Sequence, residues 1–142
     1  MSGDDQLADR LGRALGGTVT SVRRLSGGAS RVTSAVELLR PDGSVRSLVL
    51  QQRRGDGLTP GTGVALEAAL LEAARRGGVP VPAVVAVGPD HGLDEGWLVV
   101  ERLDGETIAR RILRDDAYVG ARSALVPELA GALARILSLI HI

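Results

Sequence analysis

Two residue types that carry much of the chemistry of enzyme sites, cysteine and lysine, are absent from this chain of 142 residues. Without cysteine the protein has no disulfide, no thiolate zinc site and no cysteine nucleophile. All 17 basic residues are arginine. A lysine Schiff base and a phosphate-binding loop of the Gly-Lys-Ser/Thr kind are therefore excluded as well.

Aromatic and imidazole side chains are almost as scarce. Trp97 and Tyr118 are the only aromatic residues, and His91 and His141 are the only histidines. These are too few for a stacking platform for single-stranded nucleic acid or for a histidine-rich metal site. The 17 basic and 17 acidic residues cancel, so no net charge attracts nucleic acid or an anionic membrane. We expect neither as a partner.

Long apolar runs are also lacking. No stretch approaches the ~20 consecutive apolar residues that a membrane-spanning helix needs. Residues 1–17 carry charges throughout, which is not the pattern of a signal peptide. These features predict a soluble, cytoplasmic protein without a membrane segment.

The residues that are present alternate between helical and strand patterns. Helical spacing predicts helices over 4–15 and 64–76, and it returns after Gly105 as far as Ile136. In the helix over 64–76, Leu66, Leu70 and Ala73 are predicted to line one apolar stripe, with Leu71 and Ala74 beside it. Strands are predicted over 18–25, 32–39, 45–52, 83–87 and 97–101.

The order of these elements indicates the fold class. Three strands in a meander are followed by one helix and two further strands. This order predicts an α+β fold with one five-stranded, mostly antiparallel sheet and the helix over 64–76 packed on it.

The same order is that of the amino-terminal lobe of protein-kinase-like enzymes. Four segments make the resemblance more specific. They resemble aminoglycoside-phosphotransferase-like kinases, a family that phosphorylates hydroxyl groups of small molecules. In chain order they are the nucleotide-loop region at 25–31, the regulatory helix at 65–71, the extended entry to strand four at 78–82, and strand five with the hinge at 97–107. The resemblance spans about residues 7–136.

The resemblance implies ATP as the cofactor and assigns two segments to it. One covers the phosphates with close backbone approach and N–H donors; it comprises Ser26, Gly27, Gly28, Ala29 and Ser30. The other is the hinge, whose backbone would bond the adenine edge; it comprises Val100, Glu101, Arg102 and Leu103. From the residues alone, the first is equally a plain hairpin turn and the second an edge strand that leads into a loop.

Strand three departs from the kinase pattern. Protein kinases place a lysine there that holds the phosphates and pairs with a helix glutamate, and the matching residue here is the neutral Gln51. Alternation puts Val49, Gln51 and Arg53 on one face, so Arg53 is the nearest same-face cation and can hold phosphate bidentately. Glu67 would orient that cation. The alternatives are a solvated strand end for Arg53 and an ordinary surface position for Glu67.

The resemblance places the catalytic base and the Mg²⁺ ligands in a carboxy-terminal lobe. They belong to a His-Gly-Asp loop, a following Asn and a later Asp, and none of these motifs occurs in the chain. No catalytic or metal-ligating residue is therefore assigned. We expect a nucleotide-binding lobe over 1–103, the hinge and first helices of a truncated second lobe over 104–136, with exposed apolar surface, and a non-native tail over 137–142.

The expected function is that of the ATP-binding lobe of a small-molecule kinase. The complete protein would transfer the γ-phosphate to a substrate hydroxyl, and this fragment alone would be inactive. Gln51 supports a rival prediction, a non-catalytic nucleotide-binding or pseudokinase-type module. A stand-alone α+β interaction domain is the third. The acceptor substrate and the oligomeric state stay open at this point.

Overall fold

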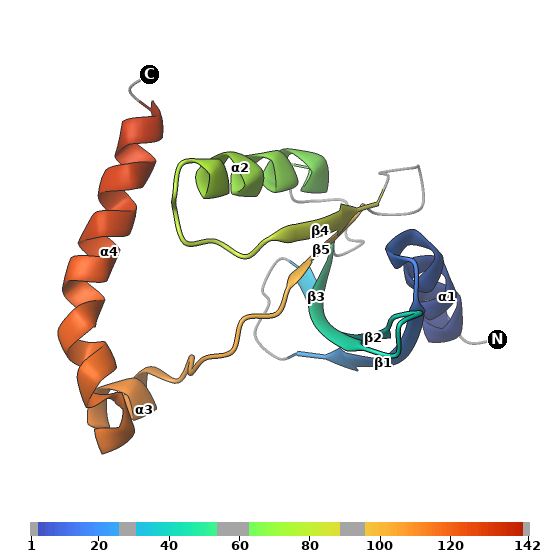
Figure 1. Cartoon of the computed structure of the whole chain (residues 1–142), viewed down its shortest axis with the longest axis horizontal. Coiled ribbons are helices and arrows are strands. Elements are labelled where there is room, and N and C mark those ends of the chain that lie inside the picture. The colour runs from blue at the N-terminus through green and yellow to red at the C-terminus, as the bar shows by residue number, and fades with distance from the viewer. Residues whose placement is uncertain (1–2, 26–30, 54–62, 89–95, 141–142) are drawn as a thin grey trace. The chain divides into compact units, whose positions relative to one another are not determined.

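The helices and strands lie within four stretches of the chain. The computed structural model describes residues 3–25, 31–53, 63–88 and 96–140. Figure 1 shows the elements, which in chain order are α1 (Gly3–Leu15), β1 (Thr18–Arg24), β2 (Arg31–Leu39), β3 (Val45–Arg53), α2 (Val64–Arg76), β4 (Val84–Val87), β5 (Trp97–Glu101), α3 (Ala109–Arg114), the 3₁₀ turn Asp116–Tyr118 and α4 (Val119–Ile140).

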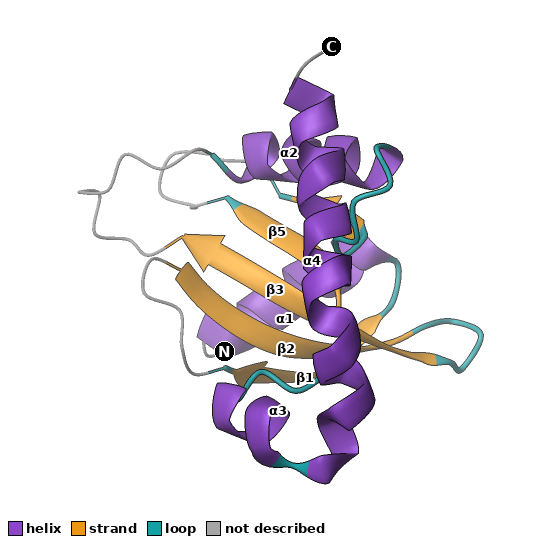
Figure 2. Ribbon diagram, turned by 90° about the vertical axis from the view of Figure 1, so that its left-hand side faces the viewer, coloured by secondary structure: helices purple, strands orange, loops and turns teal. Residues whose placement is uncertain are grey.

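All five strands form one sheet, in the order β1-β2-β3-β5-β4. Every neighbouring pair is antiparallel, which confirms the predicted α+β class and the five-stranded sheet. The last strand, β5, enters between β3 and β4: Val100 is the partner of Val49 on one side and of Val84 on the other. Figure 2 shows β1, β2, β3 and β5 side by side, with α1 passing behind them.

The two faces of the sheet are covered by different helices. On one face Leu11 of α1 joins a buried cluster whose sheet members are Val36, Leu38, Leu48, Leu50, Trp97 and Val99. On the other face Val64 and Ala68 of α2 pack with Leu98 and Val100. The helix α1 was predicted from the sequence, but its packing on the sheet was not. Because side chains alternate along a strand, β5 contributes to both clusters.

Helix α2 has the bounds that the sequence predicts, but it turns a different side to the sheet. Leu66 and Leu70, predicted to line the apolar stripe, are 50% and 59% exposed. The buried residues are Val64 and Ala68, with Leu71 packed beside them. The prediction was wrong for Leu66 and Leu70 because α2 is apolar on several sides, whereas Leu71, predicted beside the stripe, does pack in this cluster.

Glycine follows the first two helices and ends them. Gly16 after α1 and Gly78 after α2 take positive φ values of 68° and 76°, which glycine adopts without a steric penalty. The N–H of Gly17 donates to Gly12 O at 3.0 Å, and that of Val79 to Ala74 O at 2.9 Å. These bonds satisfy carbonyls that the helix ends would otherwise leave free.

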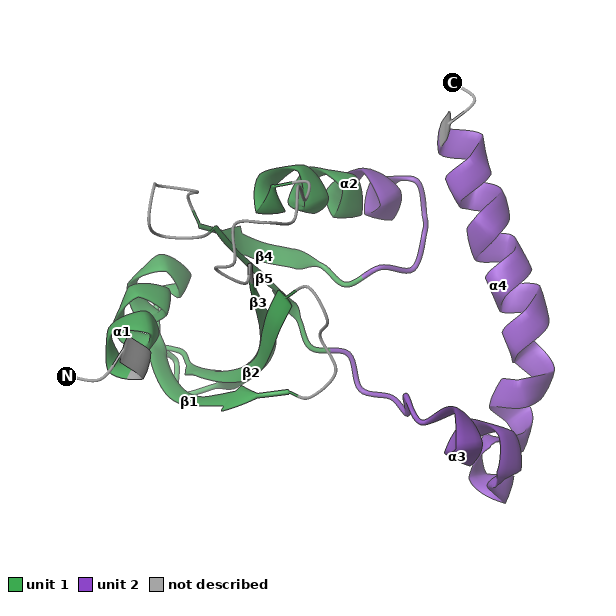
Figure 3. Ribbon diagram, turned by 180° about the vertical axis from the view of Figure 1, so that it is seen from behind, with its two compact units in different colours: residues 1–72, 82–102 green, residues 73–81, 103–142 purple. Residues whose placement is uncertain are grey.

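The chain divides into two compact units, coloured separately in Figure 3. The first comprises residues 1–72 and 82–102 and holds the sheet, α1 and most of α2. The second comprises residues 73–81 and 103–142, with α3, the 3₁₀ turn and α4.

Polar contacts hold the start of the second unit. Glu106 Oε1 accepts hydrogen bonds from the N–H groups of Thr107 and Ile108, each at 2.9 Å, and the other carboxylate oxygen forms an ion pair with Arg111 in α3. Arg122 of α4 donates to the carbonyls of Ile112 and Asp115, both at 2.8 Å. Glu106 and Arg122 thus satisfy backbone groups at the two ends of α3.

Apolar side chains of the second unit are widely exposed, as the sequence predicts for these helices. The exposed ones are Leu103, Ile108, Leu113, Val119, Leu125, Val126, Leu129, Leu133, Ile136, Leu137 and Leu139. Within the described residues, no helix combines the length and the apolar character that crossing a membrane requires.

The first testable prediction concerns Gly88, whose N–H donates to Trp97 O at 2.8 Å. A Cβ atom there would lie 1.9 Å from Cε2 of Trp97, a ring that is only 8% exposed. Gly88→Ala should therefore lower the free energy of unfolding in urea by about 1–3 kcal/mol through overpacking. Gly105→Ala is the matched control, because its Cβ would meet nothing within 4 Å. Equal unfolding midpoints for the two variants would contradict the packing described for Trp97.

The second prediction concerns protonation of Glu106. The hydrogen bond from Ile108 N–H and, less strongly, the charge of Arg111 hold the pKa of Glu106 below its ordinary value. Because this pKa is lower in the folded state than in the unfolded state, ionised Glu106 stabilises the fold. That stabilisation is complete above the unfolded-state pKa and is lost as the pH falls through the folded-state pKa. A carboxyl-carbon NMR titration should give Glu106 a lower midpoint than a peptide glutamate has. Arg111→Gln should move it part of the way back, and a midpoint at or above the peptide value would refute the capping role.

Candidate functional site

The face of the sheet that α2 partly covers carries an apolar row across three strands. Ala35 of β2 is the partner of Val49 in β3, and Val49 is the partner of Val100 in β5. Ala35 and Val100 are buried, and Val49 is half-buried. Val49 and Val100 also pack in the cluster with Val64 and Ala68 of α2.

The next row along the strands is polar at its centre. Thr33, Gln51 and Leu98 are neighbours there, and Gln51 is half-buried. The predicted alternation in β3 is confirmed by packing, since Val49 contacts the α2 cluster while Leu48 and Leu50 lie in the α1 cluster. Gln51 therefore shares the face of Val49, as predicted, and brings no charge to it.

The first position of β2 and the last of β3 meet in the row beyond Gln51. There Arg31 is the partner of Arg53, and the structure describes Arg53 only as the end of its strand. Arg31 reaches from β2 to α2, where its Nη2 forms an ion pair with Glu67 Oε2. The side chains are 23% and 31% exposed. The helix glutamate thus pairs with a cation of strand two, whereas the sequence predicts a cation of strand three.

Sequence reasoning missed Arg31 as a site residue. Its one signal is its place directly after the small-residue turn, at the start of a strand. Its pairing with Glu67 depends on the register of β2 against β3 and on which side α2 turns to the sheet, and neither follows from local spacing.

The predicted hinge is anchored by the sheet. Glu101 N–H donates to Ala83 O at 2.9 Å, and Glu101 Oε1 accepts a bond of the same length from Ala83 N–H. Arg102 N–H donates to Ser47 O at 3.3 Å, and its guanidinium lies 3.5 Å from a carboxylate oxygen of Glu37. The sheet therefore uses two of the hinge N–H groups. Leu103, at which the chain passes from the first unit into the second, is 62% exposed.

The predicted phosphate loop, Ser26 to Ser30, lies outside the described residues. Its flanks are described: Arg24 in β1 is the partner of Ser34 in β2, and Leu25 N–H donates to Thr33 O at 2.8 Å. The segment therefore joins two adjacent antiparallel strands directly before Arg31.

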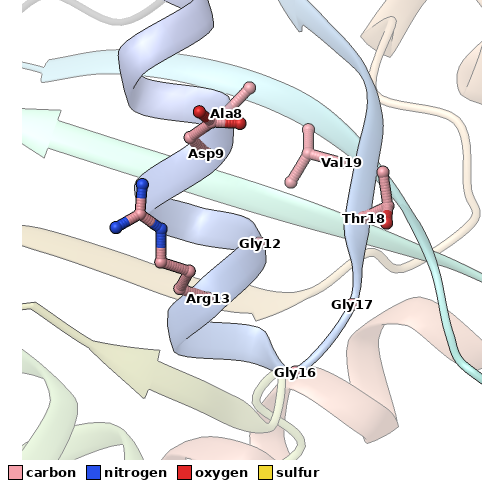
Figure 4. Close-up of a pocket in the computed structure, with 8 residues that line it drawn as sticks. All are labelled: Ala8, Asp9, Gly12, Arg13, Gly16, Gly17, Thr18 and Val19. Carbon is pink, nitrogen blue, oxygen red and sulfur yellow. The ribbon is translucent and has the colours of Figure 1, made fainter.

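A pocket lies elsewhere, between α1 and the start of β1 (Figure 4). Its volume is about 440 Å³ and its lining residues are Ala8, Asp9, Gly12, Arg13, Gly16, Gly17, Thr18 and Val19. None of these is a predicted site residue, and α1 packs on the face opposite the Ala35–Val49–Val100 row. The pocket is therefore separate from the candidate site.

Acidic side chains do not gather in the described stretches. Among those residues, no three His, Asp or Glu side chains lie close enough together to hold a metal ion.

The five-stranded antiparallel sheet with α2 on one face is consistent with a kinase-like amino-terminal lobe. The family model of the phosphotransferase enzyme family, APH, matches residues 21–141. The chain belongs to this family, as the sequence resemblance indicates. No curated protein was matched.

The third prediction is that Arg31 and Glu67 stabilise one another. Arg31→Met and Glu67→Gln should each lower the free energy of unfolding, and the double variant should lose less than the sum. We expect a coupling energy of about 1 kcal/mol from a pair that is partly shielded from water. The exposed pair Arg40–Asp42, whose closest atoms are 3.9 Å apart, is the control and should give a coupling near zero. Additive losses at Arg31 and Glu67 would show that the pair does not form in solution.

Proposed function

We propose that this chain is the nucleotide-binding lobe of an ATP-dependent kinase that phosphorylates a hydroxyl group of a small molecule. The observation that carries the proposal is the match to the phosphotransferase family over residues 21–141. The five-stranded sheet with α2 on one face supports it.

The apolar row would receive the adenine ring. Ala35, Val49 and Val100 would lie against one face of the base, close to the hinge that follows β5. Backbone groups of the hinge would bond the base edge. Glu101 and Arg102 commit their N–H groups to the sheet, so neither of these two groups would be free for the base edge.

The phosphates would extend toward the opposite ends of these strands. That end of the sheet carries Gln51, the Arg31–Glu67 pair and the flanks of Ser26 to Ser30. Bound ATP would supply the phosphoryl group that an acceptor hydroxyl attacks, and the chain's own residues would bind and orient it. We place the base and the Mg²⁺ ligands in a carboxy-terminal lobe outside this sequence.

The fourth prediction tests nucleotide binding by titration calorimetry. The chain should bind ATP and ADP weakly and should release no ADP when mixed with ATP and hydroxyl compounds. Val49→Phe should weaken ATP and adenosine alike, by about tenfold, because the ring fills the space of the base. Val45→Phe is the matched control on the same strand, since Val45 is 62% exposed and lies at the hairpin end. Circular dichroism checks that both variants fold.

Two results would count against the proposal. Failure of the wild-type chain to bind ATP would refute nucleotide binding. Phosphoryl transfer by the chain alone would refute the assignment of the catalytic groups to another lobe.

Gln51 favours a second candidate, a nucleotide-binding module without catalysis, because a neutral amide holds phosphate less strongly than a cation does. Any longer reading frame found in the parent DNA, expressed and assayed with ATP, would separate the two. A product that carries His-Gly-Asp, a following Asn and a later Asp, and that consumes ATP, supports the kinase. A product that binds ATP without turnover supports the module.

A further inference from the structure

One guanidinium nitrogen on the candidate face is buried and has no hydrogen-bond partner among the described residues. It is Nη1 of Arg31, although Nη2 of the same guanidinium pairs with Glu67. Guanidinium groups carry five N–H donors and no acceptor. A buried donor of this kind is costly when unpaired, and nearly all such groups in proteins are satisfied. Arg31 therefore retains a donor that fits an anionic ligand.

The position of Arg31 matches the region where the phosphates would lie. It stands opposite Arg53, one row beyond Thr33 and Gln51, on the same face as the apolar Ala35–Val49–Val100 row. It also directly follows the segment predicted to cover the phosphates. Arg102, another cation on this face, is held near Glu37 at 3.5 Å.

Glu67 fixes the direction of the Arg31 side chain. The carboxylate sits on the side of α2 that carries the buried Val64 and Ala68, so packing of the helix sets its place. The ion pair at Nη2 restrains the guanidinium, while Nη1 stays without a partner among the described residues. A planar, pre-positioned guanidinium binds a phosphate oxygen more favourably than a free side chain does.

We propose that Arg31 of β2 supplies the cation that binds the nucleotide phosphates, in place of the neutral Gln51 of β3, and that Glu67 is its positioning residue. The proposal rests on the proposed nucleotide binding. Under this proposal, the positive charge that β3 lacks at Gln51 is supplied by Arg31 of the neighbouring strand β2.

The fifth prediction compares ATP with adenosine, since only ATP presents phosphate to Arg31. Titration calorimetry of the full chain should show tighter binding of ATP than of adenosine. Arg31→Gln should weaken ATP binding by about tenfold, the effect of losing a charge-assisted hydrogen bond, and leave adenosine binding unchanged. Arg46→Gln is the matched control, because Arg46 is an exposed strand arginine on the α1 face at the hairpin end.

Two further variants keep the test decisive if Arg31→Gln does not fold. Arg31→Lys retains the charge but cannot pair with Glu67 and phosphate as a planar fork, so it should lose part of the ATP preference. Glu67→Gln leaves Arg31 in place without its anchor and should weaken ATP binding less than Arg31→Gln does. In both variants adenosine affinity should stay at the wild-type value.

The results distinguish the role of Arg31 from nucleotide binding itself. If wild type prefers ATP over adenosine and every folded Arg31 variant keeps that preference, the role of Arg31 is overturned and nucleotide binding stands. If the Arg31 variants lose the same affinity for ATP as for adenosine, Arg31 only stabilises the structure and does not bind the phosphates. Absence of any nucleotide binding by wild type would overturn both proposals.

Discussion

Burial of β5 on both faces is the constraint on which the first unit depends. Its side chains alternate, so that Trp97 and Val99 enter the cluster with α1 while Leu98 and Val100 enter the cluster with α2. Insertion between β3 and β4 also brings the hinge segment beside the middle strands. The same strand therefore joins the two cores and sets where the candidate adenine surface ends.

The second interaction that organises the site is electrostatic. Arg31 and Glu67 join a strand end to a helix across the half-buried edge of the candidate face. In protein kinases a lysine of strand three makes the corresponding link, and this chain has no lysine. The structure forms the link from the strand alongside, which leaves the family architecture in place although the residue at the expected position is neutral.

Local chemistry made much of the fold predictable. Val64–Arg76 and Trp97–Glu101 have the predicted bounds because helical spacing and a run of strand-forming residues are unambiguous there. Glycine pairs likewise fixed the helix ends. The buried side of α2 was not predictable, since leucine and alanine on several sides leave the stripe undefined until the sheet selects Val64 and Ala68. Arg31 was missed because it joins the site through strand register and not through spacing. The roles of Gln51, Arg53 and the hinge stay predictions.

The central claim is that nucleotide binds the face of the sheet that carries Ala35, Val49 and Val100, with its phosphates at Arg31. An NMR titration of the isotope-labelled chain with ATP tests this most directly, because backbone, methyl and arginine Nε signals report each face separately. The account predicts shifts at those three residues and at the Arg31 side chain. Shifts confined to Asp9, Arg13 and Thr18, which line the pocket beside α1, would contradict it.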